Sequence, residues 1–319
     1  VIKSLIQKTK LKEDMIDEII LGQVLTGSCG QNPARQAAIN SGIPKEKTAI
    51  IINQVCGSGL RSIVNGYQSL LTNSANFIIA GGQESMTNSI HDQMMKDGLT
   101  DAFYNYHMGV TAENVAAKYN ISRQEQDEFA IESQQKANIA INKKKFDDEI
   151  INDDIDEHPR KGITINDLSK LNSVFKEKGT VTPGNSSGIN DGAAAVVLTT
   201  RELAEKHNLE ILGKIISWAT CGVDPSIMGL GPIPSSNKAL EIAKWNVKDL
   251  DLVEINEAFA AQSIAVIKEL KIPKEKVNVN GGAIALGHPI GASGARIVVT
   301  LLNELKKISG QKGLATLCI

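Results

Sequence analysis

The sequence predicts an α/β protein of two similar halves, with a helical segment inserted beside the first. Apolar runs alternate with helical patterns near both ends of the chain, an order typical of parallel sheets covered by helices. In each half a strand leads through a glycine-rich turn into a helix, once around Cys56 and once around His288. Residues 87–188 are instead polar, charged and largely helical.

We therefore expect three units along the chain. The first half comprises residues 1–86 together with 189–209, the inserted segment comprises 87–188, and the second half comprises 210–319. The likeness of the halves is architectural and suggests an internal duplication. Inserted segments of this kind often form a wall or lid of a substrate site.

In the first half, short apolar runs bounded by glycines and polar residues predict buried strands, and three- and four-residue spacing predicts helices. We expect strands over 16–24, 48–55 and 77–80 and helices over 34–39 and from Leu60 onward. The glycines of 81–86 predict a loop at the end of a strand, where α/β sheets bind ligands.

The inserted segment and the second half follow from the same rules. Ser122 and Glu125 form a capping-box pattern that opens a helix, and the charges of 143–156 favour a solvated loop. Helices are expected over 201–207, after Phe259 and from Ala292, and strands over 193–199, 211–219, 251–255, 277–280 and 314–319.

Composition excludes several classes of partner. The 319 residues carry 34 Lys and Arg against 36 Asp and Glu, so nothing favours nucleic-acid binding. No apolar run approaches the roughly 18 residues that cross a membrane. The four cysteines lack metal-ligand spacing and suit reduced thiols of a cytoplasmic protein. Because the chain opens at Val1 inside an amphipathic pattern and stops after an apolar run, we expect it to be the core of a longer product.

Cys56 occupies the turn between a predicted strand and a predicted helix, followed by Gly57, Ser58 and Gly59. A helix N-terminus offers free N–H groups and a positive dipole end, which favour a thiolate. This is a suitable place for a nucleophile. Free cysteines are also among the most buried residues, so this stretch alone leaves a small core residue as the alternative.

Three further side chains could join such a nucleophile. His288 lies in a loop of small residues between Gly287 and Pro289, where it could face a ligand or be satisfied by backbone. Asn256 interrupts an apolar run with an amide that needs a partner. Cys318 lies near the end of the last predicted strand. A histidine can activate a thiol, and a second thiol is suited to removing a proton from carbon.

Four motifs in this order resemble the thiolase family: Asn53–Gly59 (NQVCGSG), Asn256–Ala260 (NEAFA), Asn280–Gly291 (NGGAIALGHPIG) and Gly313–Ile319 (GLATLCI). The resemblance runs along the whole chain and is closest to the short-chain biosynthetic members. It implies two βαβ-type halves with mixed sheets in a layered αβαβα arrangement. It also implies that two acetyl-CoA are joined into acetoacetyl-CoA and CoA, reversibly, without cofactor or metal, by a homotetramer or homodimer.

By this resemblance, Cys56 is the nucleophile that becomes acetylated and His288 takes its proton. Asn256 holds a water in an oxyanion hole, and Cys318 is the acid/base for the second acetyl-CoA. The Tyr106–Gly109 stretch (YHMG) resembles the short-chain enzymes. Residues that match positions lining the CoA or acyl pocket are His107, Met108, Arg160, Phe175, Gly184, Ser187, Met228 and Phe259.

Other readings remain, and so do departures from the family pattern. One alternative is a ketoacyl synthase of the same fold, but such an enzyme lacks a second cysteine like Cys318. A second is a non-catalytic acyl-CoA-binding homologue, which is expected to have lost one of the reactive residues. A third is a Cys–His hydrolase, which would consume acetyl-CoA without a second substrate. The glycines that follow the second cysteine in the family are missing after Ile319. The stretches 86–94 and 150–156 are shorter than in the family. They are either real deletions or, as we expect, places where segments are missing from the printed chain.

Overall fold

A computed structural model describes residues 1–151 and 155–319 of the chain. The first sheet has the order β2-β1-β3-β4. Its strands are β1 (Glu18–Gly22), β2 (Thr48–Ile52), β3 (Ile78–Ser85) and β4 (Asp191–Leu198). β1 pairs parallel with both β2 and β3, whereas β4 pairs antiparallel with β3, so the sheet is mixed as predicted. Because β4 follows the inserted segment, the chain leaves this sheet and returns to it.

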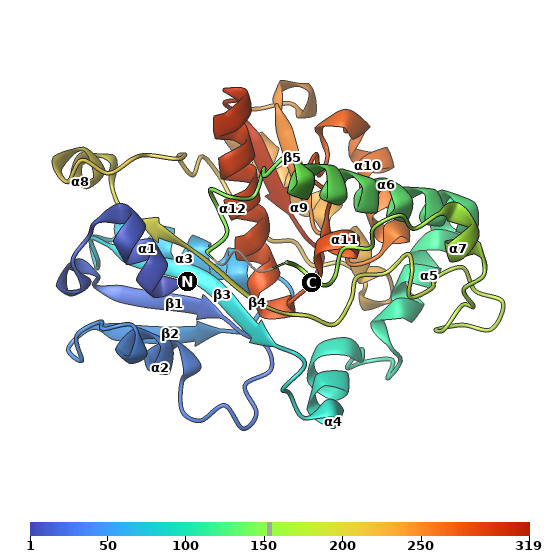
Figure 1. Cartoon of the computed structure of the whole chain (residues 1–319), viewed down its shortest axis with the longest axis horizontal. Coiled ribbons are helices and arrows are strands. Elements are labelled where there is room, and N and C mark those ends of the chain that lie inside the picture. Colours follow the sequence, from blue (N-terminus) through green and yellow to red (C-terminus); the bar gives the residue numbers. More distant parts are fainter. Residues whose placement is uncertain (152–154) are drawn as a thin grey trace.

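Helices cover both faces of the first sheet (Figure 1). α1 (Ile2–Thr9) and α2 (Pro33–Asn40) lie on one face, and α3 (Ser58–Leu71) and α12 (Ile290–Ile308) lie on the other. Successive strand residues point to opposite faces, so Ile19 packs with α1 and α2 while Ile20 packs towards α3 and α12. Burial on both faces explains why β1 reads as an uninterrupted apolar run.

The second sheet lies on the other side of α12 (Figure 1). β5 (Leu252–Ile255) and β6 (Gly313–Thr316) pair parallel. Leu301 and Leu305 of α12 pack on one face of this sheet, and α9 (Pro232–Ala243) and α10 (Ala260–Leu270) pack on the other. The layers therefore alternate as helix, sheet, helix, sheet, helix, which confirms the predicted arrangement.

The inserted segment lies against the second half. Its main helices are α5 (Met108–Tyr119) and α6 (Arg123–Asn142), and both pack towards α10. The predicted capping box forms at the start of α6, between Ser122 and Glu125. The division into 1–86 with 189–209, 87–188 and 210–319 stays a proposal.

Short elements complete the described chain: η1 (Glu13–Met15), α4 (His91–Gln93), η2 (Met94–Leu99), α7 (Ile165–Ser169), α8 (Arg201–Lys206), η3 (Pro225–Leu230), η4 (Val247–Asp249), η5 (Lys274–Lys276) and α11 (Ala283–Leu286).

Two predicted strands are wrong. Residues 211–219 form no strand, because no backbone hydrogen bond joins them to a neighbour in the described part of the chain. Ile215 nevertheless packs against the apolar cluster that contains Ile20 of β1. Residues 277–280 make only one bridge, from Val277 to Val253, because Asn278 takes a left-handed conformation with φ 44°. Apolar side chains mark these segments for burial, but pairing needs a neighbouring strand.

Other boundaries also differ from the sequence expectations. Residues 81–85, which were predicted to lie in a loop, instead extend β3 to Ser85, because each of them pairs with a residue of β4. Residues 143–151 are not simply solvated: Lys145 pairs with Glu304 at 2.7 Å, and Glu149 accepts from Thr300 at 2.9 Å. Of the two stretches that are short for the family, 86–94 lies within the described chain and 152–154 of the other lie outside it. The expectation that segments are missing at these places stays a prediction.

Candidate active site

A strained turn presents Cys56 at the carboxyl end of the first sheet. Val55 has a left-handed conformation with φ 45°, which is why the strand expected to reach it stops at Ile52. The Asn53 side chain accepts from the Val55 N–H at 2.9 Å, and Ser58 Oγ donates to the Val55 carbonyl at 2.6 Å. α3 begins two residues after Cys56. The motif around the cysteine thus holds an unusual backbone in place.

The structure brings Cys56 and His288 together although 232 residues separate them. Cys56 Sγ lies 3.3 Å from His288 Nε2. Their helices, α3 and α12, pack backbone to backbone: a Cβ added to Gly59 would lie 2.8 Å from the Ala295 nitrogen. Since the two reactive side chains lie at the N-terminal ends of these helices, the glycine contact sets the separation between thiol and imidazole.

Hydrogen bonds assign the tautomer of His288. Ser293 Oγ donates to the Pro289 carbonyl at 3.0 Å, and it lies 2.5 Å from His288 Nδ1. With its single proton engaged, Ser293 must accept from Nδ1–H, so Nε2 is left as an acceptor facing the thiol. The His288 backbone is fixed as well, because its N–H donates to Asn190 Oδ1 at 3.0 Å.

Burial keeps this pair neutral. It lowers the pKa of His288 to about 4, with a smaller contribution from Arg296. It also raises the pKa of the Cys56 thiol well above its ordinary value, and the nearby Cys318 and Glu84 raise it further. Near neutral pH the resting pair is a thiol beside an imidazole, despite the helix N-terminus expected to favour thiolate. A nucleophilic role for Cys56 would therefore require proton transfer to accompany the attack by sulfur rather than to precede it.

Asn256 lies beside the same imidazole. It follows β5, is fully buried, and its Nδ2 lies 3.4 Å from each ring nitrogen of His288. Its Oδ1 is buried with no hydrogen-bond partner among the described residues. A buried acceptor of this kind calls for a donor such as a water or a ligand. This agrees with the water-holding role that the resemblance implies.

Cys318 follows β6 and lies in the same site. Its side chain is 1% exposed, and burial raises the pKa of its thiol to about 12. A Cβ added to Gly57, next to Cys56, would lie 2.7 Å from Cδ1 of Ile319, next to Cys318, so the segments that carry the two thiols lie against each other. The apolar cluster that includes Cys318 contains four of the predicted pocket residues: Phe259, which is buried, and Met108, Phe175 and Met228, which are partly buried.

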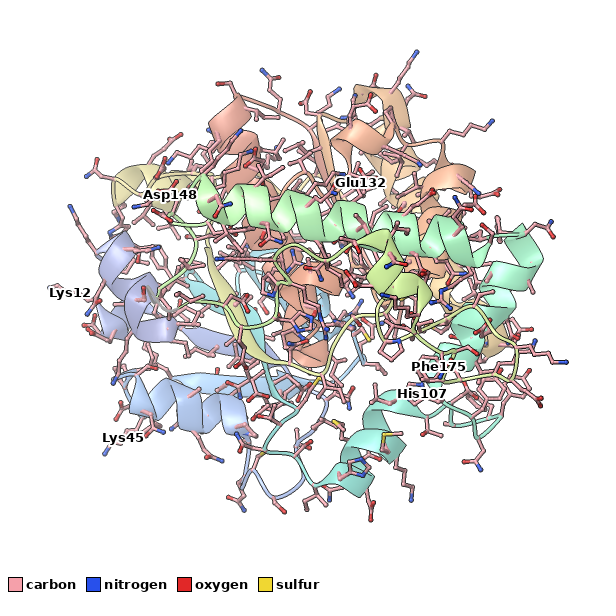
Figure 2. All side chains as sticks on the ribbon, turned by 45° about the vertical axis from the view of Figure 1, so that its right-hand side comes forward. Lys12, Lys45, His107, Glu132, Asp148 and Phe175 are labelled. Atoms are coloured by element: carbon pink, nitrogen blue, oxygen red, sulfur yellow. The ribbon has the colours of Figure 1, made fainter. Side chains whose placement is uncertain are left out.

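An aromatic pair forms one wall next to this group. The ring of His107 stacks on Phe175 with centroids 4.5 Å apart, and Figure 2 shows the two side chains together at one end of the inserted segment. Phe259 meets Phe175 edge to face at 6.2 Å. His107 Nδ1 accepts from the Gly109 N–H at 3.0 Å, so the proton of the neutral ring lies on Nε2. His107 can therefore donate one hydrogen bond to a ligand.

Three predicted binding residues lie outside this group. Arg160 is exposed, and its hydrogen bonds among the described residues run from its backbone N–H to Gln134 and from Asn138 to its carbonyl. Gly184 packs against leucine side chains, where a Cβ would meet Leu168 and Leu171. The half-buried Ser187 donates its N–H to the Ala258 carbonyl at 3.0 Å. No contact in the structure tests their predicted roles.

Sequence reasoning missed four residues that hold the site: Glu84, Asn190, Glu257 and Ser293. Glu257 is buried and accepts from Ser133 Oγ at 2.6 Å and from Asn278 Nδ2 at 2.8 Å. It lies next to Asn256 in the chain, so these bonds fix the segment that carries the amide. The carboxylate of Glu257 within the Asn256–Ala260 motif was the one signal in the sequence that pointed to such a role. Its hydrogen-bond partners could not be predicted, because they come from distant segments.

No group of three or more His, Cys, Asp or Glu side chains is placed to hold a metal ion within 1–151 and 155–319. In the same ranges, no helix has both the length and the apolar character needed to cross a membrane.

The chain belongs to the thiolase family. The model of the thiolase N-terminal domain matches residues 1–94 and 88–202, and that of the C-terminal domain matches 209–319. Among curated relatives, the acetyl-CoA acetyltransferase of Rhizobium meliloti (strain 1021) is 53% identical and that of Shinella zoogloeoides is 52% identical. Each alignment covers 100% of this chain and 88% of the relative.

Solved structures confirm the thiolase fold. The acetyl-CoA acetyltransferase of Bacillus anthracis superposes with a TM-score of 0.95 at 39% identity, covering 100% of this chain and 88% of that one. Human mitochondrial 3-ketoacyl-CoA thiolase in complex with CoA gives 0.95 at 40% identity, covering 100% and 87%. The alignment with the Rhizobium relative spans 345 residues against 319 here, so that relative carries residues this chain lacks. The two matched pieces of the N-terminal domain meet at 88–94, where the sequence is short for the family.

Proposed function

We propose that the chain is an acetyl-CoA acetyltransferase, which condenses two acetyl-CoA to acetoacetyl-CoA and CoA and runs in reverse as a thiolase. The observation that carries this proposal is the 3.3 Å contact between Cys56 Sγ and His288 Nε2, with the second buried thiol of Cys318 nearby. Relatives of about 50% identity over the whole chain carry that name, which supports the same activity here.

In the first half-reaction, Cys56 Sγ attacks the carbonyl carbon of acetyl-CoA while its proton moves to His288 Nε2. The carbon–sulfur bond to CoA breaks, and the departing thiolate takes that proton, so CoA leaves as a thiol. One thioester replaces another, so no energy source is required. Ser293 supports this step by holding the proton of the resting ring on Nδ1.

In the second half-reaction, Cys318 removes a proton from the methyl group of a second acetyl-CoA. The resulting carbanion attacks the acetyl carbonyl on Cys56, a carbon–carbon bond forms, and the bond to Cys56 Sγ breaks. Deprotonation needs Cys318 as thiolate, which forms when its own proton moves to His288. Cys318 then keeps the proton from the methyl group, and the proton on His288 passes to the Cys56 thiolate that the condensation releases. Two half-reactions through one covalent intermediate give ping-pong kinetics.

Hydrogen-bond donors stabilise the negative charge that develops on each carbonyl oxygen. We assign His288, a water on Asn256 and the Nε2–H of His107 to this task; removing one such donor typically costs about 3–4 kcal/mol of barrier. Met108, Phe175, Met228 and Phe259 would enclose the acyl group. Arg160 would meet a CoA phosphate from the surface, and Gly184 and Ser187 would border the pantetheine arm.

Other aspects of the proposal rest on the sequence. We propose a cytoplasmic enzyme that works as a homotetramer or homodimer and needs no cofactor beyond its CoA substrates. A ketoacyl synthase is disfavoured by the buried thiol of Cys318, and a non-catalytic homologue is disfavoured by the close Cys56–His288 pair. A Cys–His hydrolase would release CoA and acetate without forming acetoacetyl-CoA.

One assay tests the proposal. Purified protein is incubated with acetyl-CoA alone, and CoA release and acetoacetyl-CoA absorbance are followed together. We expect one CoA released per acetoacetyl-CoA formed, and neither product from Cys56→Ser. CoA release without acetoacetyl-CoA would indicate a hydrolase, and full activity of Cys56→Ser would refute the proposed mechanism.

A further inference from the structure

Glu84 lies where the two halves meet, close to the reactive pair. It is the second-last residue of β3, and its side chain is only 4% exposed. Oε2 accepts from the N–H groups of Val24 at 3.0 Å and Gly291 at 2.9 Å, and Oε1 accepts from the N–H of Leu25 at 3.1 Å. One carboxylate thus joins three segments: β3, the chain after β1 and the first turn of α12.

Each hydrogen bond of Glu84 holds a segment that contacts Cys56 or carries His288. Gly291 follows His288 by three residues, so its bond fixes the start of the helix behind the imidazole. Val24 and Leu25 belong to the apolar cluster against which Cys56 packs. A Cβ on Gly291 would lie 2.7 Å from Glu84 Oε2, so the absence of a side chain there allows the close approach.

We propose that Glu84 is a positioning residue that sets the register between Cys56 and His288 and carries a negative charge beside them. Because all three partners are N–H donors, both of its oxygens must accept, and an amide would place N–H against N–H at one of them. This inference rests on the proposed function for its consequence in catalysis, and on the contacts of Glu84 for the rest.

The charge gives a readout that a purely structural residue would not affect. The titratable groups facing Cys56 are His288 from the loop before α12, Cys318 from the chain after β6, and Glu84 from β3; Asp191 of β4 in turn faces Glu84. Glu84 raises the pKa of the thiol. Removing its charge should therefore shift alkylation of Cys56 to lower pH, while disturbed geometry slows acetylation.

The experiment compares the wild type with Glu84→Gln, Glu84→Asp and Asp17→Asn. Asp17 is a matched control, because its carboxylate accepts from the N–H groups of Asn76 at 2.7 Å and Phe77 at 3.2 Å at the opposite end of the same sheet. Single-turnover acetylation with labelled acetyl-CoA and iodoacetamide alkylation between pH 7 and 10 are both read on the Cys56 peptide by mass spectrometry.

We expect Glu84→Gln to acetylate about tenfold or more slowly than Asp17→Asn. Its alkylation profile should move to lower pH by about half a unit, and that of Glu84→Asp should stay in place. An acetylation rate of Glu84→Gln within twofold of that of Asp17→Asn, or an unmoved pH profile of alkylation, would overturn the inference.

Should Glu84→Gln not fold, the acetylation rate of Glu84→Asp decides the question. Slow acetylation supports the inference, and a wild-type rate overturns it. If the wild type forms no acetyl-Cys56, the proposed function fails, whereas the alkylation profile still tests Glu84.

Discussion

Replacing Ser293 by alanine tests the proton arrangement on His288. The change removes the acceptor 2.5 Å from His288 Nδ1 in a site where the ring is 5% exposed. A buried donor left without a partner costs about 1–3 kcal/mol, and here that cost falls on the tautomer that leaves Nε2 free for Cys56. At about 1.4 kcal/mol per factor of ten, acetylation of Cys56 should slow by about 5- to 150-fold.

The assay is single-turnover transfer from labelled acetyl-CoA, with the unfolding free energy measured alongside. Ser62→Ala is the control, because Ser62 is also fully buried and also donates to backbone carbonyls, those of Gly59 and Gly81. Both variants should lose stability, but only Ser293→Ala should acetylate slowly. Equal acetylation rates in the two variants would refute the tautomer assignment.

Two further predictions follow from burial and packing. Because burial lowers the pKa of His288 from 6.5 to about 4, the folded state binds its proton less readily, so the unfolding free energy should fall as pH drops from 6.5 to about 4. Denaturant titrations should show a smaller fall in His288→Gln; an equal fall would exclude His288 as the source. Gly59→Ala places a Cβ 2.8 Å from the Ala295 backbone nitrogen and should destabilise by about 1–3 kcal/mol. Gly66→Ala meets side chains rather than backbone, with Leu198 Cδ1 at 2.7 Å and Ile78 Cγ2 at 3.3 Å, and should cost less; the reverse order would contradict the packing argument.

Local patterns were sufficient where one segment determines its own structure. The apolar run of β1, the capping box at Ser122 and the turn carrying Cys56 were all readable because neighbouring residues supply the interactions. The strand expected over 211–219 failed because a strand also needs a distant partner. Likewise, the glycines predicted as a loop extend β3, since β4 pairs with them.

The site divides in the same way. Cys56, His288, Asn256 and Cys318 belong to extended motifs, so the sequence could name them as candidates. The structure brings Cys56 and Asn256 into contact with His288. Glu84 and Ser293 could not be predicted, because their roles appear only through hydrogen bonds: those of Glu84 reach residues 59 to 207 positions away, and that of Ser293 depends on a ring orientation. No local pattern encodes either.

Two thiols divide the reaction in the proposed mechanism, and Cys318→Ala separates their roles. The variant is mixed with labelled acetyl-CoA, and acetyl-Cys56 and acetoacetyl-CoA are measured in the same sample. We expect that Cys56 is still acetylated, with one CoA released per site, while acetoacetyl-CoA does not form. Condensation at the wild-type rate, or loss of acetylation in a folded variant, would contradict the assignment of Cys318 as the acid/base.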